Sequence, residues 1–95
     1  MNINPLVDRR VLDPDEVKKI VKEVSGVLDC HAIRTRGYED NFFIDLNIHL
    51  DGNISLSRAH DITHKVEEIL KKNYPGIIDV IIHTEPHGHM PCSKD

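Results

Sequence analysis

Residues 42–51 read FFIDLNIHLD, and apolar and polar side chains alternate along the stretch. One set of alternate positions holds Phe42, Ile44, Leu46, Ile48 and Leu50, and the other holds Phe43, Asp45, Asn47, His49 and Asp51. A period of two is typical of a strand with one buried face and one polar face. Asp51-Gly52-Asn53 is a turn sequence that ends it. The stretch therefore predicts a β-strand with His49 on its polar face.

Upstream, the sequence predicts a helix over about residues 13–24. Asp13 can cap it, Pro14 suits its first turn, and Glu16 can complete a capping box. Apolar positions then follow at helical spacing, namely Val17, Ile20, Val21 and Val24.

A second strand is predicted over about residues 27–36, followed by a polar turn over 37–41. Its alternation is ambiguous. The better core face consists of Leu28, Cys30 and Ala32. This assignment places Asp29, His31 and Ile33 on the other face.

Downstream, Ser55 is predicted to cap a helix that runs to about Asn73 and is ended by Pro75-Gly76. Its apolar stripe is expected to be Leu56, Ala59, Thr63, Val66, Ile69 and Leu70. A last strand over 77–85 stops at Pro86. One face of it is predicted to carry Ile78, Val80 and Ile82, and the other Asp79, Ile81, His83 and Glu85.

The order helix, strand, strand, helix, strand predicts an α+β fold with a three-stranded mixed sheet. The long helix between two strands implies a right-handed parallel crossover, whereas the hairpin before it is antiparallel. Two helices can cover only one sheet face. We therefore expect one domain over 13–86 with an open, histidine-bearing sheet face. Residues 1–12 are interpreted as an N-terminal arm and 87–95 as a flexible tail.

Composition narrows the function classes. The chain has 95 residues, 12 Lys and Arg against 16 Asp and Glu, and only two Phe and two Tyr. This acidic, aromatic-poor balance argues against nucleic-acid binding. The apolar runs are too short for a membrane helix. The two cysteines are 62 positions apart and form no CxxC pair, which favours a reducing compartment. The seven histidines are the distinctive feature.

Three strands place potential metal ligands on the predicted open face: His31, His49, His83 and Glu85. Neighbouring strands are about 4.8 Å apart, so these side chains can converge on one ion. Imidazole and carboxylate groups suit zinc and its divalent neighbours. The alternative interpretation is that they are ordinary polar surface residues.

The other histidines carry weaker signals. His60 and His64 are one helical turn apart, but the HExxH motif of zinc peptidases is absent. We interpret His60 as a ligand offered to a site elsewhere, such as one in another subunit. The tail, with His87, His89 and Cys92, could recruit metal or simply be a solvated end.

The sequence also indicates that the chain is not an enzyme. Cys30 and His31 are adjacent in a strand, so their side chains point to opposite faces and cannot pair as nucleophile and base. Phosphate-loop and nucleophile-elbow motifs are absent from the sequence.

Collinear motifs over residues 6–86 resemble the cytoplasmic C-terminal domain of cation diffusion facilitator transporters. They are VSGV (24–27), HAIRTR (31–36), IHL (48–50), SLSRAH (55–60), YPG (74–76) and VIIHTEP (80–86). The resemblance implies a metallochaperone-like, ferredoxin-like αββαβ fold that dimerises. It also implies zinc binding near the dimer interface, coupled to the membrane helices of the transporter.

The resemblance also implies site residues. His31, His49, His60 and His83 match histidines of the family, and Glu85 stands where members have a bridging aspartate. His64 and His87 are additional candidates without a counterpart in that pattern. Asp8 resembles an aspartate that forms a charge interlock with a lysine at the membrane end.

The sequence thus predicts the regulatory, homodimeric cytosolic domain of a zinc-type efflux transporter at the cytoplasmic face of the membrane. The expected ion is Zn²⁺, or another divalent cation such as Cd, Co, Ni, Mn or Fe. The expected partners are a second copy of this chain and the transporter's own transmembrane domain. We expect this chain to be the cytosolic domain excised from that transporter. Two alternatives stay open: a free-standing metal chaperone or buffer, and a metal-independent dimerisation module.

Overall fold

The computed structural model describes residues 12–38 and 41–87. Two helices and three strands follow one another in the predicted order: α2 (Pro14–Lys22), β1 (Asp29–Tyr38), β2 (Asn41–Leu50), α3 (Leu56–Asn73) and β3 (Ile77–Pro86). The sheet order is β1-β2-β3, with β1 antiparallel and β3 parallel to β2. The predicted mixed sheet is therefore confirmed.

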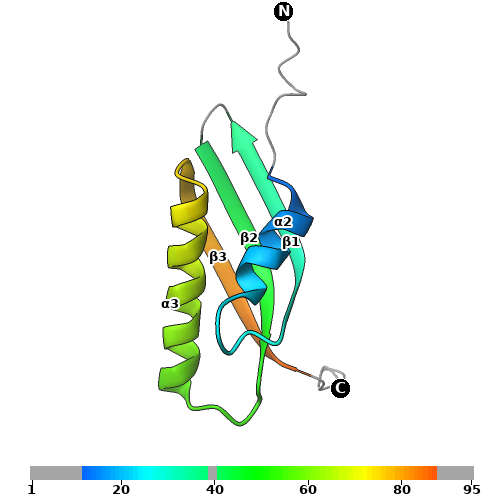
Figure 1. Cartoon of the computed structure of the whole chain (residues 1–95), viewed down its shortest axis with the longest axis vertical. Coiled ribbons are helices and arrows are strands. Elements are labelled where there is room, and N and C mark those ends of the chain that lie inside the picture. The colour runs from blue at the N-terminus through cyan, green and yellow to red at the C-terminus, as the bar shows by residue number, and fades with distance from the viewer. Residues whose placement is uncertain (1–11, 39–40, 88–95) are drawn as a thin grey trace, which may run out of the picture.

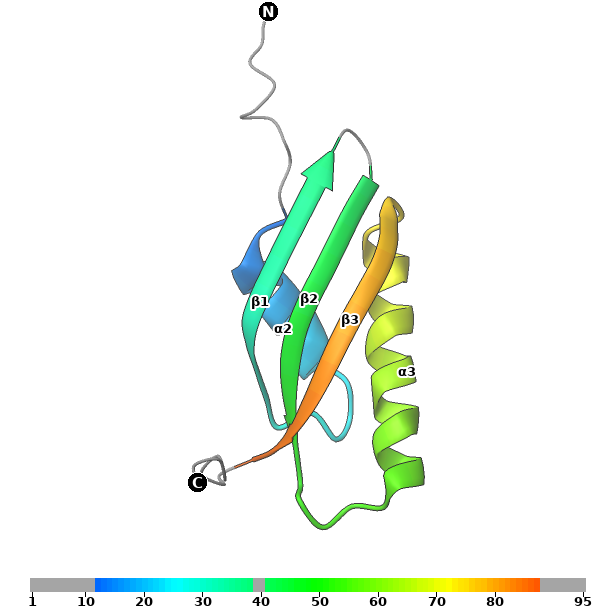
Figure 2. The ribbon, with the colours of Figure 1, turned by 180° about the vertical axis from the view of Figure 1, so that it is seen from behind.

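Both helices lie on the same side of the sheet (Figure 1). Seen from behind, the three strands face the viewer without a helix in front of them (Figure 2). The described part of the chain thus has one covered and one open sheet face, as the sequence predicts.

Side-chain caps explain where the helices begin. The Asp13 carboxylate accepts a hydrogen bond from the Asp15 backbone N–H at 3.0 Å, and Pro14 occupies the first turn. The Ser55 hydroxyl accepts one from the Arg58 N–H, also at 3.0 Å. Such caps satisfy backbone donors that a helix cannot pair internally. The first helix ends at Lys22, two residues earlier than the sequence predicts.

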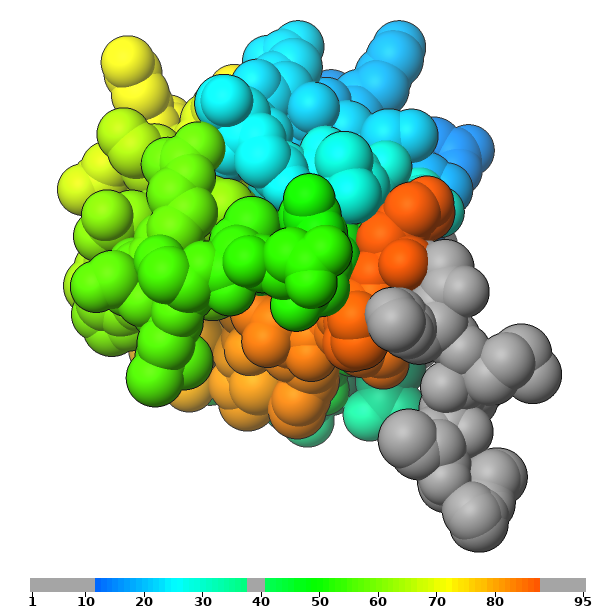
Figure 3. All heavy atoms as spheres, turned by 90° about the horizontal axis from the view of Figure 1, so that it is seen from below, coloured from blue at the N-terminus to red at the C-terminus, as the bar shows by residue number. Residues whose placement is uncertain are grey.

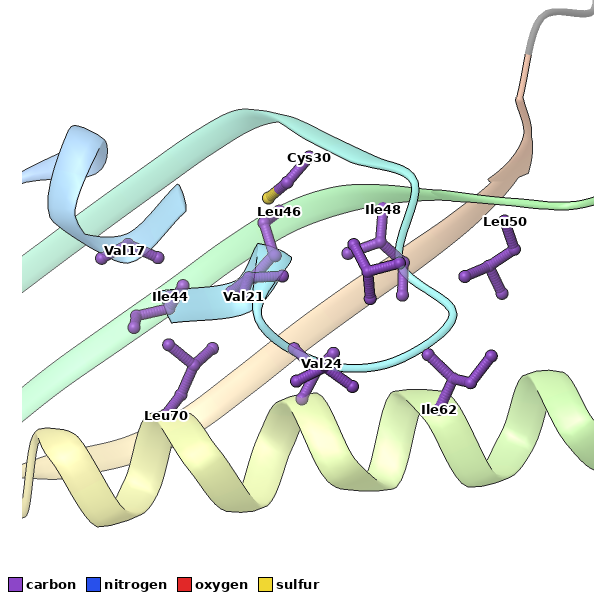
Figure 4. Packing of buried hydrophobic residues seen from close by; sticks show 12 residues of the cluster. Val17, Val21, Val24, Cys30, Ile44, Leu46, Ile48, Leu50, Ile62 and Leu70 are labelled. Carbon is purple, nitrogen blue, oxygen red and sulfur yellow. The ribbon is translucent and has the colours of Figure 1, made fainter. Parts of the chain in front are cut away.

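The core lies between the covered sheet face and the helices (Figure 4). The alternation in residues 42–51 is confirmed, because alternate β2 side chains are buried, namely Ile44, Leu46, Ile48 and Leu50. Facing helix side chains are fully buried as well, namely Val17, Val21, Val66 and Leu70.

The predicted faces of β1 are partly wrong. Cys30 is buried as expected, but Leu28 is 47% exposed and Ile33 packs against the core. Leu28 lies before β1 begins, whereas the position of Ile33 follows from a β-bulge between His31 and Arg34, where Ala32 takes a φ of 55°. A bulge adds one residue to a strand and so reverses the side-chain alternation beyond it. His31 precedes the shift and keeps its predicted face.

Two apolar assignments in α3 and β3 are also wrong. Leu56 is 87% exposed, and Ile62, which the predicted stripe omitted, is buried. In β3, Ile77 packs against the core and Ile78 is 55% exposed, because the register of β2 and β3 shifts between Phe42 and Phe43. Val80 and Ile82 keep their predicted core-facing positions.

The ends of the chain fall mostly outside the described residues, including most of the predicted arm and tail. Leu12 is described, and it packs against the core. Among the described residues, neither helix combines the length and apolar composition needed to cross a membrane.

Candidate metal site

Three predicted ligands meet at one end of the open sheet face. Single ligand atoms of His31, His49 and Glu85 lie within 4.8 Å of one another. The residues come from β1, β2 and β3, and the parallel register sets His49 opposite Glu85. Figure 3 shows this end of the molecule, where the last residues of β3 (orange) lie beside the start of β1 (cyan) and the end of β2 (green). We call these three residues the sheet site.

Both imidazoles of the sheet site point their Nε2 atom toward Oε1 of Glu85. His49 Nε2 lies 3.3 Å from Glu85 Oε1, and His31 Nε2 lies 3.9 Å from it. The two rings meet edge to face, with centroids 4.5 Å apart and planes at 85°. Two nitrogens and one oxygen thus surround a common point.

Asn47 holds the carboxylate in this orientation. Its Nδ2 donates a hydrogen bond of 3.0 Å to Glu85 Oε2, which leaves Oε1 toward the histidines. A carboxylate that binds a metal is commonly oriented by a hydrogen bond to its other oxygen. Asn47 lies two residues before His49 on the same face of β2, and no sequence motif marks it as part of a site.

His49 is the most enclosed member of the sheet site. Its side chain is only 18% exposed. Its buried Nε2 atom has no hydrogen-bond partner among the described residues. Buried polar atoms are normally hydrogen-bonded, so an unpartnered one calls for an explanation. A ligand bound at Nε2 provides one.

His87 contacts the opposite side of the His49 ring. The two Nδ1 atoms are 3.2 Å apart. The backbone N–H of His87 donates to the Leu50 carbonyl at 2.8 Å, which fixes the chain just after β3. His87 therefore contacts His49 on the side away from the Glu85 carboxylate.

Asp29 adds local negative charge beside the site. It is the Cα partner of His49 in the antiparallel ladder. The backbone N–H of Cys30 donates to its carboxylate at 2.8 Å, and the Nζ atoms of Lys18 and Lys22 each lie 3.8 Å away. The hydrogen bond from Cys30 has the largest effect and lowers the pKa of Asp29. Burial opposes it, and the nearby Lys18 and Lys22 lower the pKa further.

The remaining candidates lie apart from the sheet site. His83 shares its face but is 59% exposed, with Nε2 3.6 Å from Asp45 Oδ1. His60 and His64 contact each other on α3. Asp8, His89 and Cys92 lie outside the described residues.

Cys30 is a core residue. Its side chain is fully buried, and burial raises the pKa of its thiol to about 11. A protonated thiol is a poor nucleophile and a poor metal ligand.

Two imidazoles and one carboxylate make a donor set that suits zinc and neighbouring divalent ions. Three protein ligands leave a coordination position for water or another donor. The arrangement is thus chemically suited to reversible metal binding.

Comparison with known proteins decides the family. Residues 11–87 match the family model ZT_dimer, described as "Cation efflux protein, cytoplasmic domain". The chain belongs to the cation efflux family, as its cytoplasmic domain. The resemblance found in the sequence is confirmed.

Two curated relatives of this cytoplasmic domain are named "Cation-efflux pump FieF". The one from Pectobacterium atrosepticum is 36% identical over 93 residues, which is 94% of this chain and 30% of the relative. The one from Klebsiella pneumoniae is 31% identical over 94 residues, 97% of this chain and 31% of the relative. The chain thus spans less than a third of these relatives.

Solved structures agree with the fold. The metal-bound C-terminal domain of the CzcD transporter from Thermotoga maritima superposes with a TM-score of 0.73 at 32% identity, covering 80% of this chain and 88% of that one. The manganese form of a MamM C-terminal domain variant gives a TM-score of 0.71 at 18% identity, covering 77% and 92%. The ferredoxin-like fold of cation efflux cytoplasmic domains is therefore confirmed for this chain.

Proposed function

We propose that this cytoplasmic domain senses divalent metal for a cation efflux transporter and does so as a homodimer. The observation that carries the proposal is the convergence of His31, His49 and Glu85 from three strands. Family membership supports it, as do relatives named cation-efflux pumps. We assign transport to the membrane part of the whole protein. We give this domain a binding role without catalysis.

In this proposal the ion is bound by Nε2 of His31, Nε2 of His49 and Oε1 of Glu85. Zinc is the expected ion because imidazole and carboxylate donors suit it, although the other divalent ions named above use similar donors. The Thermotoga maritima relative is described as metal-bound, which supports metal binding in general. His83 lies two residues before Glu85 and is a further ligand if its ring leaves Asp45.

Metal acts here by shifting a conformational equilibrium. An ion that binds one dimer arrangement more tightly than another favours the first by the difference in binding free energy. At 100 times its dissociation constant, a ligand stabilises the state it binds by about 2.7 kcal/mol. A divalent cation also reduces repulsion between two chains that each carry a net charge of −4.

The open sheet face is the surface on which we place the second copy. Phe43 is 38% exposed and Ile81 is 47% exposed, and both line a hollow with Arg34, Arg36 and Asp79. Covering such apolar side chains favours association. The name of the family model also refers to a dimer. The sheet site lies at one end of this face.

Zinc titration of the metal-free protein by calorimetry tests the proposal. We expect His31→Ala and His49→Ala each to abolish the tight binding event of the wild-type chain. His83→Ala measures how much the fourth candidate on this face contributes, and we expect it to weaken binding far less. Equal binding by wild type and His49→Ala contradicts the proposal.

Chelation separates the metal sensor from a metal-independent dimerisation module. Zinc that binds only the folded state should raise the melting temperature, and a chelator should reverse the shift. Analytical ultracentrifugation under the same conditions measures the fraction of the protein that is dimeric. An unchanged melting temperature and dimer population contradict the sensing role.

A further inference from the structure

The helix α2 is a short element that is held to the rest of the domain at few points. It has nine residues, fewer than the roughly 12–15 at which an isolated helix becomes even marginally stable in water. Val17 and Val21 are its fully buried side chains, and Ile20 packs against the core in part. The helix therefore depends on these side chains and on polar contacts with its neighbours, β1 and α3.

A hydrogen bond ties the first turn of α2 to the residue that follows α3. The Tyr74 hydroxyl donates to Glu16 Oε1 at 2.8 Å, although the two residues are 58 positions apart in the sequence. Burial and this hydrogen bond raise the pKa of Tyr74, so its hydroxyl stays protonated and can donate. A hydrogen bond to a carboxylate is stronger than one between neutral groups. We call this contact the latch.

The ion pairs of α2 are weaker than the latch. Lys18 Nζ and Lys22 Nζ each lie 3.8 Å from Asp29 Oδ1, and all three side chains are more than a third exposed. Ion pairs this exposed contribute little to stability, because water screens the charges and long side chains lose freedom when they pair. The latch is therefore the polar contact that we expect to limit detachment of the helix.

The side chain of Cys30 lies on the sheet face that α2 covers. Cys30 belongs to β1, which is an edge strand of the sheet, and its side chain is fully buried. Figure 4 shows this side chain on the same side of the sheet as Val17 and Val21. Two lysines of α2 also reach Asp29, the residue before it. Detachment of α2 would therefore expose the Cys30 thiol to solvent.

We propose that α2 is a hinged cover over β1 and that the latch holds it closed. The chain after the helix stays anchored, because Val24 and Val27 are buried in the core. Opening thus releases α2 as a unit and leaves the sheet in place, as in local unfolding. It also releases Leu12, whose carbonyl accepts a hydrogen bond of 3.3 Å from the Thr35 hydroxyl on β1. The cover controls access to Cys30 and requires no residue of the sheet site.

The reactivity of the Cys30 thiol measures opening of the cover. The probe is an aromatic disulfide reagent, which forms a mixed disulfide with an exposed thiolate and releases a coloured thiolate. The 95-residue chain with Cys92→Ser carries Cys30 as its only cysteine. In this background Tyr74→Phe keeps the ring and removes the hydroxyl. We expect it to speed labelling of Cys30 by about tenfold, which corresponds to about 1.4 kcal/mol.

Variants of Glu16 test whether the hydroxyl and the carboxylate act as a pair. Glu16→Ala should speed labelling as much as Tyr74→Phe does, and the double variant should be no faster than either single one. Glu16→Gln retains an acceptor and should lie between wild type and Glu16→Ala. Additive effects of Glu16→Ala and Tyr74→Phe would overturn the latch.

The urea dependence of labelling separates opening of the cover from unfolding of the whole chain. Opening of α2 exposes little surface, so we expect the labelling rate to change weakly with urea, whereas global unfolding responds steeply. Ile82→Val is the matched control, because it removes a methylene group that packs against the core from β3. It should leave labelling unchanged at low urea. Labelling with the urea dependence of global unfolding, or equal acceleration by Ile82→Val, would overturn the cover.

Discussion

His49 and His87 contact each other through their Nδ1 atoms at 3.2 Å, while Nε2 of His49 lies 3.3 Å from Glu85 Oε1. Only one of two facing imidazole nitrogens can carry the shared hydrogen. If His49 Nδ1 donates it to His87, the lone pair of His49 is on Nε2, where a metal would bind. A hydrogen bond on the far ring nitrogen commonly sets the tautomer of a ligating histidine.

Replacement of His87 should therefore weaken zinc binding without removing a ligand. We expect His87→Phe, which keeps a ring but has no nitrogen, to raise the zinc dissociation constant by about tenfold or more. His87→Asn, which retains an acceptor, should lose less. ¹⁵N shifts of the metal-free protein report the His49 tautomer, and an unchanged tautomer in His87→Phe refutes this role.

Asn47 should contribute through the carboxylate that it orients. Asn47→Ala removes the 3.0 Å hydrogen bond to Glu85 Oε2, and we expect zinc affinity to fall by about tenfold or more. The same substitution at Asn41, which is exposed at the start of β2, is the matched control. Calorimetry measures both variants, and equal affinities argue against a role for Asn47.

Gly26 should be needed for stability. It has a φ of +101°, and a Cβ placed there would lie 2.5 Å from Ile62 Cδ1. We expect Gly26→Ala to lower the free energy of unfolding by about 1–3 kcal/mol, from backbone strain and overpacking. Gly52→Ala, at an exposed glycine without a positive φ, should change it by less than about 0.5 kcal/mol. Urea denaturation measures the free energy of unfolding of both variants. Equal values for Gly26→Ala and Gly52→Ala would contradict this prediction.

Asp29 should make stability depend on pH in the acid range. Its pKa is lowered from 3.8 in the folded state, so the ionised form stabilises the fold above that pH. This stabilisation is lost as pH falls through the lowered pKa. The loss should be smaller in Asp29→Asn, which cannot ionise. The urea midpoints of the wild type and of Asp29→Asn at about pH 5 and pH 3 test this prediction. An equal fall in midpoint for the two proteins would disprove it.

The sequence predicts the fold well where local pattern and tertiary packing agree. Alternation along 42–51 identifies the core face of β2, because burial requires every second side chain to be apolar. The same reasoning cannot locate the Ala32 bulge, since φ values near 55° are uncommon for residues other than glycine. Ile33 is misassigned for this reason.

The candidate site is predictable only in part. Alternation places His49 and Glu85 on the open face, but only the register of β2 and β3 sets them opposite each other. That register includes a shift at Phe42/Phe43, which the sequence does not signal. The positions of Asn47 and His87 around the site likewise follow from side-chain packing.

The most direct measurement of the central claim is anomalous diffraction at the zinc edge from a zinc-soaked crystal of this chain. We predict an anomalous peak at about 2.0–2.2 Å from Nε2 of His31, Nε2 of His49 and Oε1 of Glu85. Zinc peaks elsewhere, with these three atoms unbound to metal, would contradict the claim.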